Sequence, residues 1–259
     1  MQDFHVHSNY SDGSFLERMV QAAESAGLEG IGFADHCALT QREPTASMRD
    51  LYGFNLDLTY ERRREAIERL RERTSIDVYD AVEMDYDPRD EARIRSFLER
   101  ADFEYAVGSV HEVDGRNVQV ASAFVECSDA ELDAVVDSYF DHLVALIDSG
   151  LFDVAAHVDL LERTEPLRGR AREGHYRRVA DAFADSQTIP EINAGRATTD
   201  AGIVHPAGPF LEVIREREVP VTLGTDSHRP DEVGPRASFL EDFLDRWGLE
   251  PVVPPALES

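Results

Sequence analysis

The sequence predicts an α/β fold in which seven parallel strands, each followed by a helix, close into a barrel. Seven short apolar runs typical of β-strands alternate with helical stretches along the 259 residues, which indicates a parallel sheet with crossover helices. Polar residues able to form a site follow successive runs, which favours a closed barrel. An open doubly wound sheet is the alternative, but the first run lacks the glycine-rich phosphate loop of dinucleotide-binding folds.

Each predicted strand is a short run of β-branched, aromatic and small apolar residues. In chain order the runs cover residues 3–6, 30–34, 76–82, 103–107, 153–156, 188–192 and 219–223. The stretches between them repeat apolar residues every three or four positions, as on one face of a helix. These predicted helices cover residues 15–26, 58–73, 90–100, 129–149, 173–184, 210–217 and 237–247, and Gly27 and Gly150 fit C-terminal caps.

The long connections are expected to lie on the rim that carries the site. They cover residues 37–55, 113–128, 161–172 and 194–209, and we expect them to shape a substrate pocket. Residues 251–259, with three prolines, are expected to form an extended or disordered tail. One domain over residues 1–259 is expected, since α/β barrels of about 200 to 250 residues commonly fold as a unit.

The chain is strongly acidic. Its 52 acidic residues against 26 basic ones give a net charge of -26, which disfavours binding to nucleic-acid backbones or anionic membranes. Every basic residue is arginine, and this bias together with the acidic excess resembles proteins of halophilic cytoplasms. The acidic surface would then reflect the salt concentration around the protein and not its function. We expect the protein to have poor stability in dilute buffer.

The sequence predicts a cytoplasmic protein that does not contact membranes. No apolar run approaches the roughly 20 residues of a transmembrane helix, and the first residues do not form a signal peptide. Cys37 and Cys127 are the only cysteines and have no CxxC spacing, which disfavours both a disulfide framework and a cysteine-based zinc site.

Histidines and acids gather at the predicted strand ends. His5 and His7 point the same way because they are two residues apart, and Asp12 follows in a Ser-Asp-Gly turn. Each of these residues alone could have an ordinary structural role, as an aspartate in a turn does. A purely structural explanation of all nine positions would require nine coincidences. The candidate metal ligands are His5, His7, Asp12, His36, Glu83, His111, His157, Asp226 and His228.

Other residues near this set have different interpretations. Asp35 precedes His36 at the end of a buried run and is expected to orient it. His142 and His175 lie in predicted helices and are interpreted as surface or packing residues. His205 lies in a rim loop, where a loop role is favoured over contact with substrate.

Six imidazoles and three carboxylates without a thiolate suit Zn²⁺, Mn²⁺ or Fe²⁺ better than Ca²⁺ or Mg²⁺. Nine side chains are too many for one ion, so we expect two or three divalent ions. Three ions would bring a charge of about +6 against about -3 from Asp12, Glu83 and Asp226. Such a positive pocket favours an anionic substrate.

These motifs together resemble the PHP (polymerase and histidinol phosphatase) superfamily, whose metal site is built from HxH, a following acid or histidine, DH, E, H, H and DxH. More narrowly, four segments resemble its histidinol-phosphatase branch. They are Val82-Glu83-Met84-Asp85-Tyr86, Val107-Gly108-Ser109-Val110-His111, Glu191-Ile192-Asn193, and the stretch from Val221 to Arg229 that contains Gly224-Thr225-Asp226-Ser227-His228.

The resemblance implies a distorted (β/α)7 barrel of the TIM type with a trinuclear metal site on the C-terminal rim of its strands. It also implies hydrolysis of the small-molecule phosphate monoester L-histidinol phosphate, the penultimate step of histidine biosynthesis. The ions would activate water, and Asp226 or His228 is placed to assist proton transfer to the leaving alkoxide. The candidate substrate and phosphate contacts are Arg163, Asn193, Arg196 and Arg229, although Ala194-Gly195-Arg196 departs from the family's longer stretch.

Three other functions are consistent with parts of the pattern. A PHP phosphoesterase acting on nucleotides or short oligonucleotides would use the same metal site. A non-catalytic metal-binding module is disfavoured because all nine ligand positions are filled. A polymerase-linked proofreading nuclease lacks its partner domains in this chain. The sequence does not specify an oligomeric state.

Overall fold

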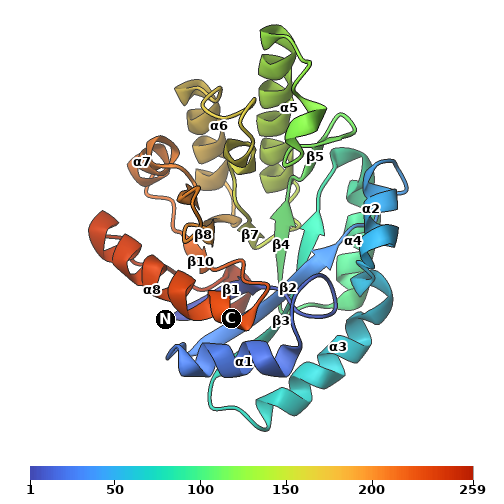
Figure 1. The fold of residues 1–259 in the computed structure, drawn as a ribbon, viewed down its shortest axis with the longest axis vertical. Helices are drawn as coiled ribbons and strands as arrows, with labels where there is room; N and C mark the ends of the chain where they lie inside the picture. Colours follow the sequence, from blue (N-terminus) through green and yellow to red (C-terminus); the bar gives the residue numbers. More distant parts are fainter. Residues whose placement is uncertain (259) are drawn as a thin grey trace.

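A computed structural model describes residues 1–258 and shows seven parallel strands curled into a barrel-like sheet (Figure 1). The order of strands across the sheet is β1-β2-β3-β4-β7-β8-β10. This order follows the chain, so each helical connection crosses to the neighbouring strand, as the predicted alternation requires. The strands are β1 (Gln2–Val6), β2 (Gly30–Cys37), β3 (Asp77–Asp85), β4 (Tyr105–Ser109), β7 (Val154–Ala155), β8 (Ile189–Arg196) and β10 (Thr222–Gly224).

The two edges of the sheet meet through the ends of β1 and β10. Val6 and Ser227 form a single parallel bridge, and the backbone N–H of His7 donates to the carbonyl of Ser227 at 2.9 Å. Next to it, the N–H of Asp226 donates to the carbonyl of His5 at 2.8 Å. Because β7 and β10 contain only two and three residues, the barrel is distorted. The predicted distorted TIM-like barrel is confirmed.

Helices surround the outside of the sheet, as Figure 1 shows. They are α1 (Leu16–Ser25), α3 (Leu56–Arg71), α4 (Glu91–Ala101), α5 (Asp129–Asp148), α6 (Glu173–Ala184), α7 (Gly208–Glu216) and α8 (Pro230–Trp247). The predicted start of the last helix at residue 237 is wrong. Pro230 is suited to a first helical position because its φ is fixed and its missing N–H would be unpaired there. The helix then continues past Pro235, losing one hydrogen bond close to its N-terminus.

Three of the predicted loops contain an α-helix or β-strands. Residues 37–55 include α2 (Thr45–Tyr52), which buries only Ala46 and therefore shows no apolar periodicity in the sequence. A hairpin of β5 (Glu112–Val113) and β6 (Arg116–Asn117) begins the next loop. In the last, β9 (Ile203–His205) pairs antiparallel with β8. Short elements of this kind lack the repeated pattern on which sequence prediction depends.

Aromatic and aliphatic side chains fill the barrel and close its N-terminal end. Tyr105 of β4 crosses the interior and donates its hydroxyl hydrogen to the carbonyl of Phe4 at 2.6 Å. Gly32 makes room for it, because an added Cβ would lie 1.8 Å from the Tyr105 hydroxyl oxygen. Residues 251–258 run beneath the barrel, where the N–H of Val252 donates to the carbonyl of Val221 at 2.9 Å. Within residues 1–258, no helix is both long and apolar enough to cross a membrane.

Candidate metal centre

The first two histidines share one face of the chain at the end of β1. Both imidazoles are buried, and their Nε2 atoms are 3.1 Å apart. Two nitrogens at this distance do not require a hydrogen bond, since each can direct a lone pair toward a common ion. His5 and His7 thus lie as the two-residue spacing predicts.

Glu83 of β3 lies at the centre of the site with a side chain only 1% exposed. Its Oε2 lies 2.8 Å from Nδ1 of His36, 3.3 Å from Nε2 of His5 and 3.5 Å from Nε2 of His7. Oε2 forms an ion pair with His36, but none of these contacts with described residues has the geometry of a hydrogen bond. Its other oxygen, Oε1, lies 3.0 Å from Nε2 of His157.

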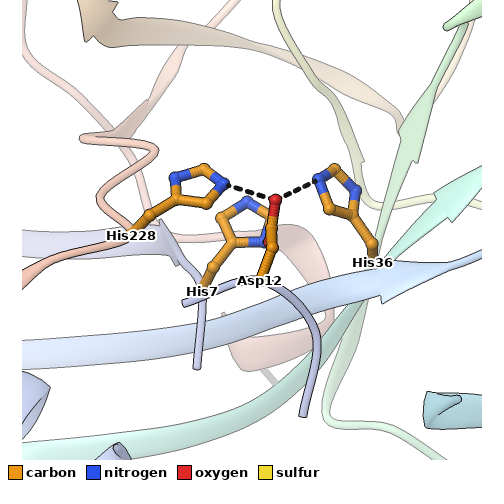
Figure 2. Close-up of side chains that lie close together, drawn as sticks. All are labelled: His7, Asp12, His36 and His228. Carbon is orange, nitrogen blue, oxygen red and sulfur yellow. Dashed lines mark ion pairs between the residues drawn. The ribbon is translucent and has the colours of Figure 1, made fainter. Parts of the chain in front are cut away.

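A second cluster lies nearer the rim and is drawn in Figure 2. Asp12 reaches from the loop after β1 to a point between His36 and His228, and His7 lies directly behind it. Its Oδ2 is 3.3 Å from Nε2 of His228 and 3.8 Å from Nε2 of His36. Its Oδ1 is 3.6 Å from Nδ1 of His7.

The candidate ligands form three overlapping groups, each able to hold a metal ion. Within each group the ligand atoms lie within 4.8 Å of one another. The groups are His7, Asp12, His36 and His228; His5, His7 and Glu83; and His36, Glu83 and His111. Asp226 borders them, with Oδ1 3.4 Å from Nε2 of His7. The structure therefore brings all nine predicted ligands to one place, and His7, His36 and Glu83 each belong to two groups.

The electrostatics of the protein without ions fit a site for cations. Burial lowers the pKa of His157 to about 3, and burial together with His228 and His36 lowers that of His7 to about 4. Burial also opposes a charge on His36, but Glu83 and Asp12 outweigh it and raise the pKa of His36 to about 10. Some imidazoles are thus ready to bind a metal, whereas others hold a proton that an ion would replace.

The surroundings of the Glu83 carboxylate indicate that the candidate ligands fit divalent ions. A buried carboxylate oxygen without a hydrogen bond costs free energy unless something else satisfies it. Three imidazole nitrogens lie within 3.5 Å of Oε2 of Glu83, one of them in an ion pair, but none has hydrogen-bond geometry to it, which is the arrangement expected of ligands that share ions. Imidazole and carboxylate donors suit zinc, manganese or iron.

A polar cavity of about 380 Å³ opens over these groups. Arg163 lines it with a side chain 12% exposed, and its Nη2 donates to Oδ2 of Asp226 at 3.2 Å. Arg196 and Arg229 line the outer wall, and Arg229 pairs with Glu232 at 2.8 Å. Asn193 is fully buried behind Arg163. Of the four predicted substrate contacts, three therefore border the cavity.

The model of the PHP domain family matches residues 3–195 of this sequence, which is well over half of the chain. The chain belongs to the PHP domain family. The matched region contains seven of the nine candidate ligands. Asp226 and His228 lie beyond it and reach the site through the contact between β10 and β1.

Relatives of similar length match most of this chain. The PHP chain is 25% identical over 255 residues to a probable histidinol-phosphatase of Deinococcus radiodurans, covering 95% of this chain and 94% of that protein. It is 26% identical over 242 residues to the histidinol-phosphatase of Lactococcus lactis, covering 87% and 83%.

Solved structures share the fold. Histidinol phosphate phosphatase from Lactococcus lactis, in complex with zinc, L-histidinol and phosphate, aligns with a TM-score of 0.77 at 18% identity and covers 97% of this chain and 95% of that one. A histidinol phosphatase of Listeria monocytogenes, described as putative by those who solved it, aligns with a TM-score of 0.72 at 17% identity and covers 92% and 99%.

The PHP domain also contains outer partners that the sequence pattern did not identify as part of the site. Nδ1 of His5 lies 2.9 Å from Oε1 of Glu191, and Nδ1 of His111 pairs closely with Asp85. Carboxylates in this position fix the orientation of a ligating imidazole. Glu191 lies inside an apolar strand, and a buried acid at such a position is the signal that could have revealed it.

The expectation that Asp35 orients His36 is wrong. The Asp35 carboxylate accepts hydrogen bonds from the N–H of Ser8 at 2.6 Å and from the hydroxyl of Ser11 at 2.7 Å, and it pairs with Arg63 at 2.7 Å. Successive residues of a strand point to opposite faces, so Asp35 faces away from His36. It anchors the loop that carries Asp12.

Proposed function

We propose that the chain is a metal-dependent phosphomonoesterase that hydrolyses L-histidinol phosphate to L-histidinol and phosphate. The observation that carries the proposal is one cavity in which three overlapping groups of metal ligands face Arg163. The proposal is further supported by relatives that match most of this chain and are named for this activity.

The three groups would hold up to three divalent ions of zinc, manganese or iron. Glu83 would be shared between neighbouring ions, because each of its two oxygens can bind one. Each neutral histidine has one free lone pair, so His5, His7, His36, His111 and His228 would each serve one ion, as would Asp12. His157 and Asp226 would complete the coordination from the two sides of Glu83 and His7. Bound ions would supply positive charge for the phosphoryl oxygens and would make hydroxide available near neutral pH.

Side chains of the protein would bind the phosphoryl group and supply a proton to the leaving group. Arg163 would donate hydrogen bonds to a phosphoryl oxygen, because its planar guanidinium matches a tetrahedral oxyanion. Arg196, at the outer wall, would provide further positive charge for the substrate. During hydrolysis, a P–O bond to water forms, the P–O bond to the alcohol breaks, and the leaving alkoxide needs a proton. His228, which is half-buried at the mouth, is placed to deliver it when its ring is not bound to an ion.

The test is phosphate release from metal-depleted protein resupplied with Zn²⁺ or Mn²⁺ in molar salt. L-Histidinol phosphate would be compared with a panel of nucleoside monophosphates and short oligonucleotides. A metal-dependent preference for histidinol phosphate would support the proposal. Preference for nucleotides would retain the hydrolytic centre but overturn the substrate, and full activity in metal-depleted protein would overturn the metal-dependent mechanism.

A further inference from the structure

We propose that Asp159 and His205 form a hydrogen-bonded relay that holds Arg163 in the orientation required to bind a phosphoryl oxygen. The inference rests on the proposed function, since it concerns the arginine that would receive the phosphate. Asp159 and His205 are positioning residues. Both are fully buried, and neither lines the cavity.

The relay is continuous from the interior to the cavity. Oδ1 of Asp159 lies 2.6 Å from Nδ1 of His205, and Nε2 of the same imidazole lies 2.9 Å from Nε of Arg163. Nη2 of Arg163 then donates to Asn193 and Asp226, both at 3.2 Å. Among residues 1–258, its Nη1 has only a long contact of 3.5 Å with Gln119 at the cavity wall. This nitrogen is the one left to meet a substrate.

The hydrogen bonds specify where the proton lies on His205. The Nε of arginine always carries a hydrogen and can only donate, so Nε2 of His205 must accept. The ring hydrogen is therefore on Nδ1, where it donates to Asp159. His205 is thus the neutral Nδ1–H tautomer, and both of its nitrogens are used.

This arrangement preserves the positive charge of Arg163 for the substrate. A carboxylate bonded directly to Nε would neutralise the guanidinium before any phosphate arrived. Here the acceptor at Nε is an uncharged ring, and the Asp159 carboxylate lies on its far side. Asp226, the acid that does contact Arg163, is also a candidate metal ligand, so a bound ion would share its charge.

The fold provides local support for the relay. Oδ2 of Asp159 accepts the backbone N–H of Ala207 at 2.7 Å, which ties the segment after β9 to the start of the short helix that carries Arg163. Asn193 of β8 stands opposite His205 of β9 in the antiparallel pair. The sequence favoured a loop role for His205, which lies in the predicted rim loop of residues 194–209. In the structure its imidazole is buried and contacts the Nε atom of Arg163 on the side away from the cavity.

The sharpest test is Asp159→Asn, which preserves shape. The amide oxygen can still accept from Ala207, and the amide NH₂ then donates to Nδ1 of His205. The ring hydrogen is forced onto Nε2, where it opposes the Nε–H of Arg163, as an Asp→Asn change beside a histidine can invert a tautomer. Displacing a positioning group by about 1 Å can cost roughly 100-fold in rate.

We expect Asp159→Asn to lower kcat/KM for L-histidinol phosphate about 10- to 100-fold. The dissociation constant of inorganic phosphate from the zinc-loaded protein should rise, while the zinc content stays unchanged. Nitrogen-15 NMR of the imidazole should show the hydrogen moving from Nδ1 to Nε2. The matched control is Asp181→Asn, which removes an exposed carboxylate paired with Arg217 and should change none of these quantities.

A double-mutant cycle separates this relay from a merely structural role. If Asp159 acts through Arg163, adding Asp159→Asn to Arg163→Ala should change kcat/KM and phosphate binding less than about twofold. An equal loss in both backgrounds would overturn the proposal, as would an inverted tautomer with unchanged phosphate binding. The wild-type protein could prove inactive on histidinol phosphate while phosphate binding still shows this coupling. That result would overturn the proposed substrate but support the relay.

If Asp159→Asn does not fold, the comparison of His205→Gln with His205→Leu decides the question. Glutamine can donate to Asp159 and accept from Arg163, whereas leucine can do neither. We expect the glutamine variant to bind inorganic phosphate at least about tenfold more tightly than the leucine variant at equal zinc content, which is about 1.4 kcal/mol. Equal binding by the two variants would refute the relay.

Discussion

His5 of β1 and Glu191 of β8 pair at 2.9 Å across β10, the strand that lies between them in the barrel. The contact joins residues 186 positions apart in the chain. It is possible because Gly224 of β10 has no side chain. An added Cβ there would lie 1.6 Å from Oε1 of Glu191 and 2.6 Å from Cβ of His5. The glycine before the Thr-Asp-Ser-His motif thus allows an outer carboxylate to reach the first metal ligand.

Gly224→Ala should therefore weaken both the fold and the metal site. Overpacking a filled interior typically costs about 1–3 kcal/mol, and here the clash is with the carboxylate that holds His5. We expect a lower midpoint of urea unfolding and weaker zinc binding. Gly174→Ala is the matched control, because no atom lies within 4 Å of an added Cβ in α6 and alanine favours a helix. Equal behaviour of the two variants would contradict the prediction.

Glu191→Gln should preserve the fold and lower zinc affinity. The change keeps the size of the side chain but removes the charge that fixes the His5 imidazole, and loss of such an outer partner typically costs about 10- to 100-fold in metal affinity. Competition with a zinc chelator would measure the effect. Glu212→Gln, at an exposed position of α7, should leave the affinity unchanged. Unchanged affinity in Glu191→Gln would show that His5 needs no such partner.

The number of bound ions should depend on which ligand is removed. His7 belongs to two of the three groups, whereas His111 belongs to one. We expect His7→Ala to lose more metal per chain than His111→Ala, as measured by atomic emission on dialysed protein. Arg229→Ala, on the outer wall, should retain the wild-type content. Equal metal loss in the two histidine variants would argue against overlapping sites.

The sequence predicted that the nine candidate ligands lie together, because strand ends in a parallel barrel meet at one rim and position along the chain translates directly into position in space. It could not supply their partners. Asp85 and Glu191 are single acids inside strands, and only the folded barrel shows which imidazole each one meets. The role of Asp35 was predicted wrongly for the same reason, since its partners Ser8, Ser11 and Arg63 come from other segments.

The fold shows a similar division between long and short elements. The seven strands and their crossover helices have clear patterns and were predicted. Helix α2 and strand β9 were missed, because eight and three residues hold too little periodicity to stand out. The extension of β2 and β3 through His36 and Glu83 was also missed, since polar residues at a strand end resemble the start of a loop.

Zinc binding should release protons near neutral pH. Burial lowers the proton affinity of His36, but Glu83 and Asp12 outweigh it and raise its pKa to about 10, so this imidazole is protonated in metal-free protein at pH 7. Calorimetry in buffers of different ionisation enthalpy would count the protons released. Each proton displaced should weaken apparent zinc affinity about tenfold per unit decrease in pH. Binding without proton release would contradict the assignment of His36 as a ligand.

Metal should therefore reverse the pH dependence of stability. In metal-free protein the raised pKa of His36 stabilises the fold fully below its unfolded value of 6.5, and this contribution is lost as pH rises toward about 10. Zinc stabilisation instead grows with pH, because fewer protons compete for the imidazole. Unfolding midpoints between pH 6 and 9, with and without zinc, should diverge. Parallel curves would exclude proton competition at this site.

Salt should stabilise the protein up to molar concentrations. With 52 acidic residues against 26 arginines, half of the carboxylates lack a basic counterpart, and their mutual repulsion destabilises the compact chain. Ion pairs such as Asp141 with Arg178 between α5 and α6 are also weakened by salt, but an exposed pair contributes only about 0–1 kcal/mol.

Relief of repulsion should therefore dominate as the screening length falls from about 10 Å at 0.1 M to about 3 Å at 1 M. We expect Tm to rise by at least about 5 °C over this range in sodium chloride. Sucrose at equal osmolality is the control, because it is excluded from the protein surface without screening charge. If sucrose raised Tm as much as salt does, repulsion would not be the cause. A Tm that fell with salt would mean that the arginine pairs on the surface outweigh the unpaired acids.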